Sequence, residues 1–201
     1  MKDLKNVSTD ELAMALRERM LATDVRVWPT EVYNLVTAIS PITCVDAFPI
    51  RMGSVGLEMG FIRRNTGFYK GRLWCVGGRV NVGESFSEAL TRHVRGTLGV
   101  GFVLHAGISW NKPVCAMQYP PQPITVADGE SSGHDPSKHA IASTYLIHLE
   151  SESFSYGSTA HGGQEAASVE WFPADELPPE NEIAYGGAAT VRMCAEWLRD
   201  I

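Results

Sequence analysis

The sequence has no long apolar run, no excess of positive charge and no closely paired cysteines. None of its apolar segments approaches the roughly 18–20 residues that a membrane-spanning helix requires. Lys and Arg number 17 against 23 Asp and Glu, and a net charge of −6 argues against a nucleic-acid-binding protein. The four cysteines form no CxxC pair, which predicts reduced thiols: Cys44, Cys75, Cys115 and Cys194.

Several signals of other protein classes are missing as well. The segment 1–20 is amphipathic and of mixed charge, without the apolar centre and small-residue cleavage site of a signal peptide. Neither a Walker loop nor a Ser-His-Asp arrangement is visible. We therefore expect a cytoplasmic protein that neither enters a membrane nor binds nucleic acid.

Residues 1–40 are expected to form a helical extension. Ser8 and Glu11 have the spacing of a capping box, and apolar residues follow at helical spacing. A second short helix follows Pro29 and should end at Ser40, because the residue before a proline avoids the helical region. We expect this extension to cover the edge of a cleft or to form a homodimer interface.

Residues 41–201 are expected to form one domain of the α/β (α+β) class. Apolar and β-branched runs predict mostly antiparallel strands at 42–50, 54–63, 73–76, 102–109, 114–118, 141–149 and 167–172. Helical periodicity predicts a helix that follows residue 83 and ends at 98, a helical turn at 174–177 and a terminal helix at 188–198. The polar loop 119–140 is long enough to suggest a functional segment such as a lid.

One segment carries a recognisable motif, the glycine-rich turn that begins at residue 77 and the helix after it. Six residues match the Nudix hydrolase signature G-x5-E-x7-R-E-U-x-E-E-x-G-U in register, where U is a bulky apolar residue: Gly78, Glu84, Arg92, Val94, Gly99 and Val100. The chain therefore resembles the Nudix hydrolases in motif over residues 73–100 and in layout over about 42–178. The resemblance implies a Nudix-type α/β/α sandwich around a mixed sheet, with structural box residues Glu84, Glu88, Arg92 and Gly99.

Within that superfamily the chain is most similar to GDP-mannose mannosyl hydrolase and its relatives, which share the string Gly-Gly-Arg-Val. The resemblance implies hydrolysis of a nucleoside diphosphate-linked substrate, with a nucleotide sugar favoured, and arginines that stabilise the departing diphosphate. Planar guanidinium groups suit that task because they bind phosphate oxygens with paired hydrogen bonds. The candidate site residues are Arg79 on the turn, Arg63 and Arg64 on the preceding hairpin, Gly77 and Gly78 in the turn itself, and Asp46 as a partner for a sugar hydroxyl.

The chain departs from the resembled family at the metal site. The family binds Mg²⁺ through carboxylates in R-E-U-x-E-E, but His93, Gly96 and Thr97 occupy those three positions here. Mg²⁺ requires oxygen ligands that are usually anionic. Any Mg²⁺ would have to use weak candidates such as Glu84, Glu88 or His93, so the Nudix box is degenerate.

A hydrolase also needs a group that accepts a proton from water. In the resembled subgroup this base lies in the loop before the last tryptophan-bearing strand, and the position in register is Ala166. The nearest candidates here are Glu165, one residue away, and His161, five residues away. The alternative is a polar loop without a catalytic role.

Two functions remain open at this stage. The first is an enzyme, a Nudix-type hydrolase in which arginine takes over part of the role of the metal. The second is a catalytically silent module that binds a nucleotide or nucleotide sugar, and the lost carboxylates favour it. For Glu84 and Arg92, a surface ion pair that fixes the loop and helix is the simpler interpretation.

Overall fold

The computed structural model describes residues 8–22, 30–124, 133–157 and 164–200. The helices are α1 (Thr9–Ala22), α2 (Thr30–Ile39), α3 (Phe86–Leu98) and α4 (Ala188–Arg199), with short 3₁₀ turns η2 (Glu180–Glu182) and η3 (Ala184–Gly186). The strands are β1 (Ile42–Met52), β2 (Leu57–Arg64), β3 (Leu73–Trp74), β4 (Val76–Arg79), β5 (Phe102–Leu104), β6 (Cys115–Tyr119), β7 (Ala140–Leu149) and β8 (Ala166–Pro173). The predicted α/β class is confirmed.

Two long strands, β1 and β7, form the centre of a mixed eight-stranded sheet and pair with each other in parallel. The first half of β1 also pairs with β4, whereas its last residues pair with β2. Along β7, β6 pairs with the first half and β5 with the last residues. Strands β3 and β8 both pair with β2. All these other pairings are antiparallel, as predicted, and the antiparallel β1–β4 pair brings the N-terminal half of β1 beside residues 77–79 of β4.

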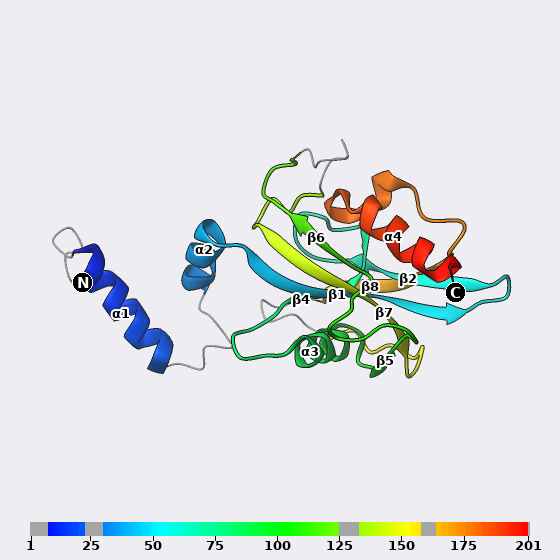
Figure 1. Ribbon diagram of the computed structural model, residues 1–201, viewed down its shortest axis with the longest axis horizontal. Helices are drawn as coiled ribbons and strands as arrows, with labels where there is room; N and C mark the ends of the chain where they lie inside the picture. Colours follow the sequence, from blue (N-terminus) through cyan, green and yellow to red (C-terminus); the bar gives the residue numbers. More distant parts are fainter. Residues whose placement is uncertain (1–7, 23–29, 125–132, 158–163, 201) are drawn as a thin grey trace.

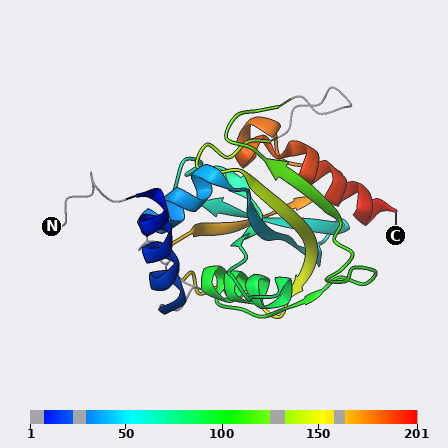
Figure 2. The ribbon, with the colours of Figure 1, turned by 60° about the vertical axis from the view of Figure 1, so that its left-hand side comes forward.

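Helices cover both faces of the sheet. Helix α3 packs against β4 and β1, and α4 packs beside β6 on the opposite face (Figures 1 and 2). The apolar stripe of α3 is buried, and so are the side chains of the two central strands, including Val45, Phe48, Tyr145 and Leu146. The result is the α/β/α sandwich that the motif implied.

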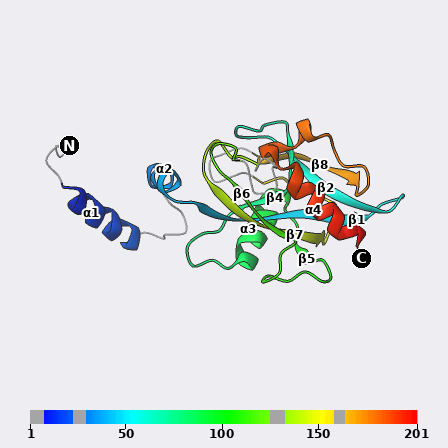
Figure 3. The same ribbon diagram turned by 45° about the horizontal axis from the view of Figure 1, so that its top comes forward.

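The N-terminal helices lie on one side of the sheet, and α1 is set apart from it (Figure 3). Ser8 and Glu11 form the predicted capping box, because the backbone N–H of each donates to the side chain of the other at 2.8 and 3.2 Å. Helix α2 contacts the domain through Val36, which packs on the core, and Tyr33. The homodimer stays a prediction. In the described part of the chain, no helix is long and apolar enough to cross a membrane.

Three sequence predictions need correction. The glycine-rich turn expected to begin at residue 77 is instead part of strand β4, in which Gly77, Gly78 and Arg79 pair with β1, and the chain turns only at residues 82–83. The strand expected at 102–109 ends at Leu104, because the chain turns at Gly107, whose φ of 82° is readily adopted only by glycine. The helical turn expected at 174–177 is a non-helical turn in which the N–H of Glu176 donates to the carbonyl of Pro173. All four cysteines are free and buried.

Candidate functional site

A cavity of about 120 Å³ opens beside Gly77 and Gly78 of strand β4. Strand β1, the end of β2, β3, β4 and the residue before β8 all contribute to its wall, so elements distant in sequence meet there. The residues that line it are Cys44, Asp46, Arg64, Trp74, Cys75, Gly77, Gly78, Tyr119, Asp135, Ala140, Ala142, Glu165 and Tyr185. Five of the candidate site residues from the sequence are among them: Asp46, Arg64, Gly77, Gly78 and Glu165.

Asp46 lies in β1 and is only 8% exposed. Its partner across the strand pair is Gly77, where a Cβ atom would collide with the Asp46 carboxylate, so glycine is needed to make room for it. Burial raises the pKa of Asp46 to about 6; a hydrogen bond with the thiol of Cys75 opposes the rise, and the charge of Glu165 adds to it. The carboxyl group therefore exchanges its proton close to neutrality, where acid–base catalysts operate.

Glu165 directly precedes β8 and is held from two sides. The hydroxyl of Thr97 on α3 donates to Oε2 at 3.0 Å. Nη1 of Arg64 lies 3.8 Å from Oε1. The backbone carbonyl of Glu165 also accepts from the N–H of Asn65 at 2.7 Å, so both backbone and side chain are fixed at the cavity wall.

Arg64 is the last residue of β2, and its side chain is 12% exposed. A register shift between Arg63 and Arg64 interrupts the pairing with β8, and such irregularities re-aim side chains. The guanidinium carbon lies 5.2 Å from the ring centroid of Tyr185. Nε of Arg64 is buried and has no hydrogen-bond acceptor among the described residues. Of the cavity-lining residues in the described part of the chain, Arg64 alone carries a positive charge.

Three aromatic rings form the apolar wall of the cavity. Trp74 contacts Tyr119 at 5.7 Å and Tyr185 at 5.3 Å between ring centroids. The hydroxyl groups of Tyr119 and Thr190 hydrogen-bond at 2.5 Å, which fixes the first ring. Tyr185 has a φ of 61°, which is rare outside glycine and which the surrounding structure must enforce. The cavity thus combines aromatic faces with three carboxylates, those of Asp46, Asp135 and Glu165, and one guanidinium.

Comparison with known proteins places the chain in a family. The model of a domain of unknown function, DUF4916, matches residues 27–193. The chain belongs to the DUF4916 family. No curated protein matches the sequence of this DUF4916 protein.

Solved structures show which fold the DUF4916 domain has. A possible asymmetric diadenosine tetraphosphate hydrolase of Jonesia denitrificans is 22% identical, with a TM-score of 0.62 over 79% of this chain and 94% of the other. The NUDIX domain of Shewanella oneidensis NrtR, crystallised with ADP ribose, is 14% identical, with a TM-score of 0.53 over 90% and 97%. An ADP-ribose pyrophosphatase of Streptococcus suis is 17% identical, with a TM-score of 0.51 over 80% and 93%. At these identities the likeness shows a shared Nudix fold.

The turn and helix of the DUF4916 protein that carry the Nudix motif are held by local contacts. Glu84 accepts from Nε and Nη2 of Arg92, both at 2.7 Å, and from the N–H of Asn81 at 2.9 Å. The hydrogen bonds from Arg92 are the main cause that lowers the pKa of Glu84. Ser85 and Glu88 cap the start of α3 reciprocally, and Gly99 ends the helix with a φ of 73°. These contacts fix the path of the chain.

The other two candidate arginines lie outside the cavity lining. The guanidinium carbon of Arg79 lies 5.0 Å from the ring centroid of Tyr33 on α2, and burial lowers the pKa of Arg79. Arg63 forms a bidentate pair with Glu170 and also donates to the carbonyl of Gly71 at 2.7 Å. Because of these contacts, Arg64 is the guanidinium that the DUF4916 fold presents to the cavity.

The residues of this DUF4916 protein do not fit the Mg²⁺ site of the resembled family. The three helix positions carry an imidazole, a hydrogen atom and a hydroxyl group, at His93, Gly96 and Thr97. Among the described residues, no group of three His, Cys, Asp or Glu side chains is placed to hold a metal ion. The candidate carboxylates Glu84 and Glu88 are engaged by Arg92 and by the helix cap, respectively.

Sequence reasoning missed two residues of the candidate site: Tyr185, which lines the cavity, and Thr97, which contacts a lining residue. Tyr185 follows no motif, because its unusual backbone conformation is imposed by tertiary packing. Thr97 was noted only as a lost carboxylate, although it lies on the buried face of α3 and orients Glu165. The second candidate base, His161, lies outside the described residues.

Proposed function

We propose that this protein is a hydrolase of a nucleoside diphosphate-linked substrate, with a nucleotide sugar as the favoured class. The observation that carries the proposal is the meeting of Asp46, Arg64 and Glu165 at one cavity beside Gly77 and Gly78 of strand β4, in a Nudix-type fold. The structures with this fold include proteins named for ADP-ribose and diadenosine tetraphosphate, which supports a nucleoside diphosphate derivative as the ligand.

Glu165 is the proposed base. Its side chain is 22% exposed, so water reaches it, and the Thr97 hydroxyl and Arg64 set its orientation. In the proposed reaction, a water oxygen bonds to the sugar carbon while Glu165 takes a proton from that water. The bond from this carbon to the diphosphate oxygen breaks, and its electron pair leaves with the diphosphate. A guanidinium group offsets the charge that develops on that oxygen.

The cavity suits the sugar part of such a substrate. Whole ligands of drug size need pockets of about 300–1,000 Å³, so a volume of about 120 Å³ accommodates one part of a nucleotide sugar. The rings of Trp74 and Tyr185 offer an apolar face to the carbon side of a sugar ring. The Asp46 carboxylate is placed to accept a hydrogen bond from a hydroxyl group. The nucleotide would then extend beyond the cavity.

The second candidate is a binding module without catalysis. The loss of the three helix carboxylates at His93, Gly96 and Thr97 favours it, because the resembled family uses them for metal-assisted chemistry. In this case, the cavity would bind the same class of ligand, and Glu165 would serve only as a hydrogen-bond acceptor.

A panel of UDP-, GDP-, ADP- and dTDP-linked sugars, incubated with the full chain in Mg²⁺ or in EDTA, tests both candidates. Chromatography of the released sugar and nucleoside diphosphate measures turnover, and calorimetry measures binding. Turnover that falls in Glu165→Gln, while binding of the substrate persists, supports the hydrolase. Saturable binding without turnover supports the binding module. The absence of both overturns the proposed function.

A further inference from the structure

We propose that helix α3 holds no divalent cation and that the Arg64 guanidinium is the positive charge that meets a ligand's phosphate in the cavity. The inference rests on the proposed function only for the choice of a phosphate-bearing ligand. It follows from the contacts that occupy the metal-binding face of the helix and from Nε–H of Arg64, a buried donor that has no partner among the described residues.

The side chain of His93, the first of the three helix positions, hydrogen-bonds to strand β4. Its Nε2 lies 3.0 Å from the carbonyl oxygen of Arg79 and donates to it as the protonated ring nitrogen. The ring lies against Gly78, where a Cβ atom would be only 2.8 Å from Cε1 of His93. Nη1 of Arg92 is 3.3 Å from the same nitrogen. A divalent cation at this nitrogen would have to displace a hydrogen bond and lie beside a guanidinium charge.

Thr97, the last of the three positions, is 4% exposed, and its hydroxyl group donates to Glu165. Its carbonyl accepts from the N–H of Gly157 at 3.3 Å, and the carbonyl of Leu98 accepts from the N–H of Ser155 at 2.9 Å, so residues 155–157 cover this end of the helix. The middle position, Gly96, has no side chain, and a Cβ atom built there meets nothing within 4 Å. The helix therefore has room for a carboxylate at 96 but does not supply one.

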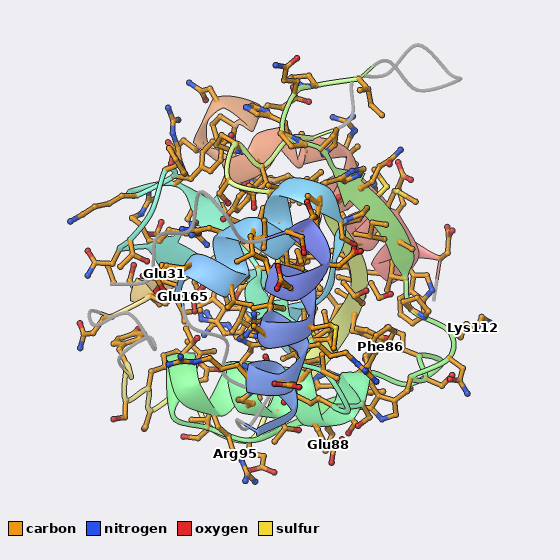
Figure 4. All side chains as sticks on the ribbon, turned by 90° about the vertical axis from the view of Figure 1, so that its left-hand side faces the viewer. Glu31, Phe86, Glu88, Arg95, Lys112 and Glu165 are labelled. Carbon is orange, nitrogen blue, oxygen red and sulfur yellow. The ribbon has the colours of Figure 1, made fainter. Side chains whose placement is uncertain are left out.

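The remaining carboxylates near α3 are engaged elsewhere. Glu84 is held by Arg92 and by the N–H of Asn81. Glu88 accepts from the N–H and hydroxyl of Ser85, at 2.8 and 2.7 Å. In Figure 4, Glu88 and Arg95 project from the outer side of α3, away from the sheet, whereas Glu165 lies on the other side of the helix. These carboxylates cannot converge on one ion with Glu165.

Arg64 differs from these carboxylates, because one of its N–H donors lacks an acceptor among the described residues. Its Nε–H is buried without a hydrogen-bond partner among the described residues. A buried unsatisfied donor is unfavourable, and Arg64 lines the cavity, so a ligand gains affinity if the guanidinium turns to give this donor an acceptor oxygen. The guanidinium lies against the Tyr185 ring, and its nearest carboxylate is 3.8 Å away at Glu165, beyond hydrogen-bond distance. A phosphate oxygen suits this group because charge-assisted guanidinium–phosphate bonds are short and strong.

Two measurements that do not depend on turnover test the inference. The first titrates the full chain with Mn²⁺, followed by electron paramagnetic resonance. We expect no saturable binding to the natural chain, and new binding in the variant Gly96→Glu/Thr97→Glu. Saturable Mn²⁺ binding by the natural chain that is lost in Glu165→Gln would overturn the metal part of the inference.

The second measurement titrates inorganic pyrophosphate in EDTA by calorimetry. We expect binding to the natural chain that weakens by about 10- to 100-fold in Arg64→Gln, and that is unchanged in the control Arg95→Gln, an exposed arginine on α3. Thermal unfolding of both variants checks that they fold. Pyrophosphate binding that appears only with Mg²⁺, or that Arg64→Gln leaves unchanged, would overturn the role of Arg64.

If no nucleotide sugar is hydrolysed, the proposed function fails, while both titrations still decide this inference.

Discussion

The motif-bearing segment 77–99 and the cavity wall beside it differ in what their charged groups do. Within the segment, Glu84 and Arg92 neutralise each other, and Glu88 caps its own helix. In the cavity wall, Asp46 is buried with a raised pKa, and Nε–H of Arg64 is buried without a partner in the part of the chain that the structure describes. The difference teaches that the recognisable motif here supplies the scaffold, whereas the groups capable of chemistry come from β1, β2 and the residue before β8.

The strongest test of this difference is the removal of the proposed base. We expect Glu165→Gln to lower turnover of the best nucleotide sugar by about 10²–10⁴-fold, the usual contribution of a positioned general base. Thr97→Val removes only the hydroxyl that orients Glu165 and should reduce turnover less. Steady-state kinetics measure both variants. If Thr97→Val lowers turnover as much as Glu165→Gln does, helix α3 takes part in catalysis and is more than a scaffold.

The second test concerns the buried carboxyl group of Asp46. A folded-state pKa of about 6, against an ordinary value of 3.8, means that folding favours the protonated form. The raised pKa of Asp46 contributes to the free energy of unfolding in full below about pH 4. This contribution, about 3 kcal/mol, is lost as the pH rises through 6. Lys138, Glu165 and Arg64 all act on this pKa, but burial dominates it.

Asp46→Asn should remove that pH dependence. We expect the variant to gain stability relative to the natural chain between about pH 4 and 8, as measured by urea unfolding at several pH values. An identical pH profile for the two proteins would mean that Asp46 is solvated. The cavity wall would then lack the buried carboxyl group that distinguishes it from the segment 77–99. Turnover provides a second readout, because Asp46→Asn should also flatten any activity change near pH 6.

The sequence predicted the scaffold better than the site. Strand β7 and helix α3 follow directly from apolar periodicity, and the C-terminal glycine of α3 marks its end, so local chemistry determines these elements. Asp46, Arg64 and Glu165 are all candidates from the sequence, but so are Arg63 and Arg79, and the sequence does not choose among the three arginines. The choice among the arginines depends on the pairing irregularity at the end of β2 and on Tyr33 of another helix, neither of which local sequence encodes.

The third test addresses the scaffold itself. Glu84→Gln weakens the pair with Arg92 while it keeps a side chain of the same shape, and the side chain of Glu84 is only 10% exposed. We expect the free energy of unfolding to fall by about 1–2 kcal/mol, because the partner arginine is partly solvated. Pyrophosphate affinity should stay unchanged if the pair is only structural. Affinity that falls without a loss of stability would instead place Glu84 among the ligand-binding groups.

The smallest expected effect is at the start of α3. Ser85 accepts from the N–H of Glu88 at 3.2 Å, and a serine-to-alanine change at a helix N-cap costs about 1 kcal/mol. Ser87→Ala is the matched control, since it removes a hydroxyl from the same turn without removing the cap. Chemical denaturation should show the loss in Ser85→Ala alone, with turnover of both variants unaltered at temperatures below unfolding. A turnover defect in Ser85→Ala at full stability would show that the helix start does more than hold the chain in place, because neither Ser85 nor Glu88 lines the cavity.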